Sequence, residues 1–76
     1  MNDSRRKRIQ SVLDSLEELK EEIEAIKDEE QDAYENLPDG IKYSERGETM
    51  EEKASRLDEA YSYMEQAADE LTEAME

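Results

Sequence analysis

Residues 50–75, MEEKASRLDEAYSYMEQAADELTEAM, place an apolar side chain at alternating steps of four and three residues. These positions are Met50, Ala54, Leu57, Tyr61, Met64, Ala68, Leu71 and Met75. Such steps average about 3.5 residues, the period at which a helix keeps one apolar stripe toward a partner helix. The stretch therefore predicts a long amphipathic helix that packs against another helix.

The first half of the chain carries a matching stripe, interrupted only at Glu30: Ile9, Val12, Leu16, Leu19, Ile23, Ile26, Ala33 and Leu37. If the chain folds back on itself, the numbers of facing residues sum to 83 or 84 along the whole stripe, which sets Ile23 opposite Tyr61. Glu30 then falls beside Lys53, so we expect these two charges to pair across the seam instead of leaving a buried carboxylate unpaired.

The only proline marks the reversal between the two halves. The order Leu37-Pro38-Asp39-Gly40 is typical of a type I turn. Asn2, Asp3 and Ser4 are candidate N-cap residues for the first helix, and Ser44 is the best candidate for the second. We predict one all-α domain over residues 1–76, an antiparallel, coiled-coil-like two-helix hairpin with helices at about 4–36 and 45–75 and a loop at about 37–44.

The hairpin is expected to self-associate. Only 34% of the residues are hydrophobic, and two helices alone leave half of each apolar stripe uncovered. Ala60, Ala67 and Ala74 form a second stripe beside the first, where another helix could approach closely, while Val12, Leu13 and Tyr34 widen the apolar face of the first helix. The sequence therefore predicts a homo-oligomer, with a dimer favoured, in which two hairpins form a four-helix bundle.

The charge is strongly negative and unevenly distributed. Twenty-four acidic and 10 basic residues give a net charge of −14, but residues 1–8 carry +3 because of Arg5, Arg6, Lys7 and Arg8. In the hairpin these basic residues would meet the acidic end of the second helix and act as a charge clamp. The acidic body predicts attraction to basic proteins and no direct binding of nucleic acid or membrane. A location in the cytoplasm of a host cell is the default expectation.

The residue types argue against catalysis. The chain has no histidine and no cysteine, which removes the usual nucleophile and base pairs and most zinc and iron sites. Asp28, Glu30 and Asp32 imitate the start of a calcium loop, but Ala33 replaces its glycine. Glu-x-x-Glu pairs such as Glu18 with Glu21 resemble those of magnesium-dependent nucleotide pyrophosphatases, yet most lie on outward faces. We expect no enzyme activity, no catalytic residue, no metal and no cofactor.

Candidate partner-binding residues lie on the outward faces and in the connection. Residues 36–47 contain both glycines and the proline; they either close the end of the bundle or form a contact site. Tyr63 lies off the seam, either as a flank residue or as an exposed anchor. The candidates are the outward carboxylates of Glu17, Glu21, Glu24, Asp28, Glu51 and Asp58, together with Tyr43, Arg46 and Tyr63.

The same connection carries a resemblance. The run Tyr34-Glu35-Asn36-Leu37-Pro38, followed by Ser44-Glu45-Arg46-Gly47-Glu48 and an acidic heptad helix, resembles a group of small, largely uncharacterised acidic helical proteins of phages and prophages of Gram-positive bacteria. The similarity covers most of the chain, with the Asn-Leu-Pro and Ser-Glu-Arg-Gly motifs as its distinctive parts. The resemblance implies a viral protein from a mobile element and no particular mechanism.

The sequence is compatible with two functions. The first is a non-enzymatic acidic binding protein, phage-encoded, that docks on a basic host or phage protein and modulates or inhibits it. Its target could be a defence enzyme, and its outward carboxylates could stand in for nucleic-acid phosphates, as in a DNA mimic. The alternative is an oligomeric protein that sequesters a nucleotide with Arg5, Arg6, Arg8 or Arg46 gathered at a bundle end.

Mutual repulsion among the carboxylates predicts a salt effect. We expect the melting temperature to rise between low and moderate salt, because counter-ions screen like charges on the surface. Thermal unfolding followed by circular dichroism measures this. An unchanged melting temperature would mean that the negative charges are better paired than their number suggests.

Overall fold

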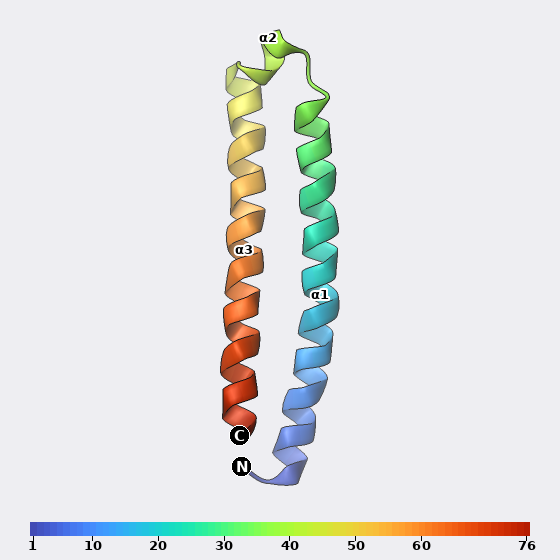
Figure 1. Cartoon of the computed structure of the whole chain (residues 1–76), viewed down its shortest axis with the longest axis vertical. Helices are drawn as coiled ribbons and strands as arrows, with labels where there is room; N and C mark the ends of the chain where they lie inside the picture. The colour runs from blue at the N-terminus through green and yellow to red at the C-terminus, as the bar shows by residue number, and fades with distance from the viewer.

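The computed structural model describes residues 1–76 and contains two long antiparallel helices joined at one end by a short one (Figure 1). α1 spans Asp3–Glu35, α2 spans Asp39–Lys42 and α3 spans Glu45–Met75. The molecule is a rod of 58 × 15 × 11 Å with both chain ends at the same pole. The predicted all-α hairpin is therefore confirmed, and the bounds of both long helices lie within one residue of those predicted.

The two helix starts use their cap residues differently. Asn2 caps α1, because its side-chain oxygen accepts a hydrogen bond from the backbone N–H of Arg5 at 2.8 Å. Ser44 occupies the cap position of α3 but makes no side-chain cap bond. Its hydroxyl donates instead to the carbonyl oxygen of Ile41 in the preceding turn. Ser44 is thus the N-cap residue as predicted, but its side chain does not cap the helix, since the hydroxyl is bonded to the preceding turn.

The predicted type I turn is replaced by one turn of helix. Pro38 has an extended backbone conformation, with φ of −58° and ψ of 147°, and precedes α2 directly. Its carbonyl oxygen accepts the N–H groups of Ile41 at 2.9 Å and Lys42 at 2.8 Å. Proline fixes its own φ and disfavours helical geometry at Leu37. The chain therefore leaves α1 at this point and begins a new helical turn at Asp39.

The register of the hairpin follows the prediction. Two contacts between the long helices mark it: Arg6 Nε donates to the carbonyl oxygen of Met75 at 2.9 Å, and Lys27 Nζ donates to Asp58 Oδ1 at 2.9 Å. Both contacts lie within three residues of the predicted pairing. The eight predicted stripe residues of α3 are all half-buried against α1.

On α1 the seam differs from the predicted stripe. Four residues of the predicted stripe, Ile9, Leu16, Ile23 and Leu37, are half-buried, as is Glu30, its recognised interruption. The other four are not in the seam: Val12, Leu19 and Ile26 are 53%, 57% and 39% exposed, and Ala33 is exposed as well. The neighbouring positions replace them, so that the seam of α1 consists of Arg6, Ile9, Leu13, Leu16, Lys20, Ile23, Lys27, Glu30 and Tyr34, and Leu37 continues it just beyond the end of the helix. Lysine can occupy such positions because its alkyl stem covers apolar surface while its ammonium stays in water.

The expected pairing of Glu30 with Lys53 is also wrong. The three ion pairs of the structure are Arg6 with Asp3, Lys20 with Glu17 and Lys27 with Asp58. Glu30 is only half-buried, so water can solvate its carboxylate without a partner.

The hairpin has no enclosed core. No hydrophobic residue is fully buried, and Gly47 is the one buried residue of the chain. Two helices form a single layer and cannot enclose a side chain on all sides, because full burial requires a second layer of secondary structure. Neither long helix contains an apolar stretch of the length needed to cross a lipid bilayer.

Gly47 is buried because α3 passes close to α2. A Cβ at this residue would press against the carbonyl oxygen of Lys42 and lie 2.8 Å from that of Ile41. Backbone atoms cannot yield as a flexible side chain can. The absence of a side chain at Gly47 therefore permits the tight junction between the two helices.

We expect Gly47→Ala to destabilise the protein by about 1–3 kcal/mol, the usual cost of overpacking. Gly40→Ala is the matched control, because a Cβ there meets nothing within 4 Å and alanine favours helix. Chemical denaturation measures both variants. Equal stabilities of the two variants would contradict the close approach of α2 to α3.

Candidate binding surfaces

The seam divides the hairpin into two sides. Successive helical residues are about 100° apart, so the residue after a seam position and the residue before it point to opposite sides. In an antiparallel pair the second helix runs in the opposite direction, and its seam also points in the opposite direction, toward the first helix. The effects of these two reversals on the placement of the following residue cancel. Residues that follow seam positions therefore share one side on α1 and α3, and residues that precede them share the other.

The side formed by the following residues is here called the acidic side, and within α1 and α3 it carries ten acids and one base, Lys7. Its acids are Asp14, Glu17, Glu21, Glu24, Asp28, Glu35, Glu51, Asp58, Glu65 and Asp69. All six carboxylates predicted to bind a partner belong to this group and are exposed. In the sequence these carboxylates are scattered outward charges, whereas the hairpin gathers them on one side.

Lys27 lies among the carboxylates of the acidic side. Its ammonium bonds to Asp58 across the hairpin, and Asp28 and Glu24 also attract it. The hydrogen bond to Asp58 raises the pKa of Lys27 above its ordinary value, although partial desolvation opposes the rise. The ammonium of Lys27 thus attracts carboxylates from both long helices. The sequence pattern did not indicate Lys27, because the apolar residue Ile26 beside it was assigned to the seam.

Tyr61 explains why two lysines suit the seam of α1. The ammonium groups of Lys20 and Lys27 lie 5.2 Å and 5.8 Å from the centre of its ring. Both distances are within the range of cation–π attraction. Lys20 also pairs with Glu17 at 3.6 Å. Two positively charged groups thus lie close to the aromatic ring, and their ion pairs with Glu17 and Asp58 connect the seam with the acidic side.

The side formed by the preceding residues, here called the apolar side, is nearly neutral. Its three acids are Glu22, Glu29 and Glu70, and its four bases are Arg5, Arg8, Lys53 and Arg56. Between them lie the large exposed residues Val12, Leu19 and Ile26 of α1, followed by Ala33. The residues Ala60, Ala67 and Ala74 of α3 share this side.

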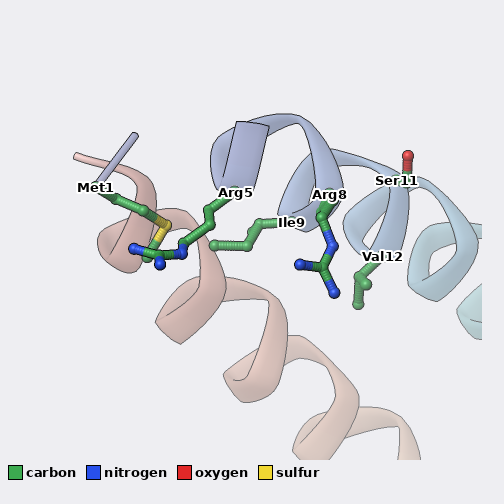
Figure 2. Close-up of a pocket in the computed structure, with 6 residues that line it drawn as sticks. All are labelled: Met1, Arg5, Arg8, Ile9, Ser11 and Val12. Atoms are coloured by element: carbon green, nitrogen blue, oxygen red, sulfur yellow. The ribbon is translucent and has the colours of Figure 1, made fainter. Parts of the chain in front are cut away.

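The basic N-terminus is engaged only through Arg6. Its guanidinium pairs with Asp3 and donates to the backbone carbonyl of Met75. Arg6 thus reaches the opposite terminus as predicted, but the expected pairing of basic residues with the acidic side chains of that end is not found. Arg5 and Arg8 instead line a shallow hollow with Ile9 and Val12, whereas Ser11 points away from Val12 (Figure 2). Arg46 lies at the other pole of the rod, so one hairpin does not bring it near these arginines.

The remaining candidate residues lie outside the acidic side. Tyr43 is 78% exposed next to α2, so it does not close the end of the hairpin as its packing interpretation would require. Arg46 is exposed and makes no ion pair with Glu35 or Asp39. Tyr63 is 66% exposed and precedes Met64, at the edge of the apolar side. The structure therefore brings the six carboxylates together and separates the three other candidates from them.

No group of acidic side chains is arranged to hold a metal ion. Comparisons with protein-family models, with curated proteins and with solved structures find no significant match to this chain. The resemblance of the Asn36-Leu37-Pro38 region to phage proteins thus stays a prediction.

The position of Lys27 predicts an effect on stability. Lys27→Met keeps most of the apolar stem but removes the cation between Asp58, Glu24 and Asp28, so we expect a lower melting temperature, most clearly at low salt. Lys53→Met removes the same charge where no ion pair exists and serves as the control. Equal melting temperatures of the two variants at low salt would mean that Lys27 does not stabilise the acidic side.

Proposed function

We propose that this chain is a non-enzymatic binding protein that docks its acidic side on a basic protein surface. The observation that carries the proposal is the gathering of carboxylates from both long helices on one side of a rod, while the opposite side is nearly neutral. A surface that served only solubility would need no such division. The separation of charge gives the rod a defined orientation toward a positively charged partner.

The partner belongs, in this proposal, to the class of basic host or phage proteins. The resemblance around Pro38 favours a phage-encoded protein that acts in the host cytoplasm and modulates or inhibits its target, including a defence enzyme. The spacing of the charges bears on nucleic-acid mimicry. Ten acids and one base along 58 Å give about one net charge per 6 Å, whereas duplex DNA carries one per about 1.7 Å. Mimicry would therefore depend on where carboxylates lie and not on equal charge density.

Assembly is the second part of the proposal. We propose that two hairpins associate into a four-helix bundle, since no hydrophobic residue is buried in one hairpin and several large ones are exposed. A homodimer would present two acidic sides, and two linked binding sites strengthen attachment to a partner that can engage both.

Nucleotide sequestration has less support. The hollow at Arg5 and Arg8 is the feature that favours it. However, Arg6 is already bonded to Asp3 and Met75, and Arg46 lies at the far pole. One hairpin therefore offers two free guanidinium groups beside apolar Ile9 and Val12 and no group that would select a base.

The role of the acidic side can be tested by comparing two variants that lose the same number of carboxylates from different sides of the rod. In Glu17→Gln/Glu24→Gln/Glu51→Gln, three carboxylates of the acidic side are removed. In the control Glu18→Gln/Glu52→Gln/Glu59→Gln, three are removed from the outer edges, midway between seam positions. Binding to a basic, sequence-nonspecific DNA-binding protein is then measured in competition with duplex DNA.

We expect the first variant to lose about tenfold in affinity and the control to lose much less, because charge close to the contact dominates association. The affinity of the unmodified protein should fall as salt is added. Equal losses in the two variants, or binding that ignores salt, would overturn the proposal for the acidic side.

A further inference from the structure

The apolar side has no partner within one hairpin, although it is built from both long helices. Val12, Leu19 and Ile26 recur every seven residues on α1 and are exposed. Ala60, Ala67 and Ala74 recur every seven residues on α3 and lie on the same side. Large side chains thus project from one helix, and the adjacent helix offers a line of small ones.

We infer that the occupant of this side is a second copy of the chain, aligned in the same direction, with the two-fold axis along the rod. The large stripe of each copy then packs on the alanine stripe of the other. The inference rests on the self-association proposed above and specifies the face and the alignment. Such a two-fold contact is self-complementary, as symmetric dimers require.

The sizes of the side chains select this alignment. With both hairpins pointing the same way, Val12, Leu19 and Ile26 lie about one residue from the levels of Ala74, Ala67 and Ala60 of the second copy, by the register that the Lys27–Asp58 contact sets in each hairpin. Large residues then meet small ones along the contact. In the opposite alignment α1 would face α1 and α3 would face α3, so that bulky residues would meet each other and hold those helices apart.

The exposed area fits one additional copy. A folded monomer of 8.9 kDa is expected to expose about 4,800 Å², and this chain exposes 5834 Å². The excess is about 1,000 Å² by this scaling. A standard interface covers about 800 Å² on each partner. One symmetric contact along the apolar side would therefore bring the exposure close to that of a compact protein.

The charges also favour this face. The acidic sides of two copies repel each other, whereas the apolar side holds four bases and three acids. At the termini, α3 ends without any basic residue in its last turn. Arg6 of the same chain serves that end through the carbonyl of Met75, and Arg5 and Arg8 line the hollow beside it (Figure 2). The inferred alignment places this hollow against the acidic C-terminal end of the second copy.

Cysteine cross-linking can test the alignment, because the chain has no cysteine of its own. Ile26→Cys and Ala60→Cys are prepared separately, mixed and oxidised, and we expect a disulfide-linked heterodimer. The control mixture of Ile26→Cys with Ala74→Cys should not cross-link, since those residues are about 21 Å apart along the helix axis. Leu19→Cys alone would cross-link to itself in the opposite alignment and should not do so here.

Light scattering of the unmodified protein tests self-association separately from the face and alignment of the dimer. We expect twice the chain mass of 8.9 kDa. Leu19→Glu should weaken the dimer by more than about tenfold, because it would bury an unpaired charge, whereas Gln31→Glu adds the same charge on the acidic side and should leave it dimeric. A monomeric unmodified protein would refute self-association. A dimer that fails to cross-link through Ile26 and Ala60, or that cross-links through Leu19, would refute only this face and alignment.

Discussion

The contact between α1 and α3 is the constraint on which the other features of the molecule depend. It contains no fully buried side chain, so each helix is held along one half-covered seam. The seam fixes which residues of each helix fall on which side of the rod. In the antiparallel pair, residues that follow seam positions lie on the same side of the rod in both helices. One pairing of two stripes is therefore enough to divide more than twenty charged residues among an acidic side, a nearly neutral side and two outer edges.

The seam of α3 could be predicted from the sequence and that of α1 only in part. On α3 the large apolar residues occupy a single stripe, so the period leaves one solution. On α1 two neighbouring stripes share Ile9, Leu16 and Ile23, and preference for hydrophobic residues selects Val12, Leu19 and Ile26. The structure selects Lys20 and Lys27 instead, because both ammonium groups lie near the ring of Tyr61 and Lys27 also bonds to Asp58. Such attraction depends on distances between side chains that periodicity does not contain.

The candidate surface shows the same difference between pattern and geometry. The six carboxylates could be identified as outward residues, but their common side follows only from the seam that the hairpin adopts. The connection was harder still. Pro38 correctly marks the end of α1, whereas the helical turn of α2 and the burial of Gly47 depend on how closely two backbones approach. Local residue preferences cannot specify that distance.

The meeting of the two chain ends at one pole has a topological consequence. Arg6 reaches the carbonyl of Met75, so a short peptide could join the termini without bending either long helix. The chain could then be reopened within α2, which would yield a circular permutant in which α3 precedes α1. The order of the helices along the gene is, on this view, separable from the surface that they form together.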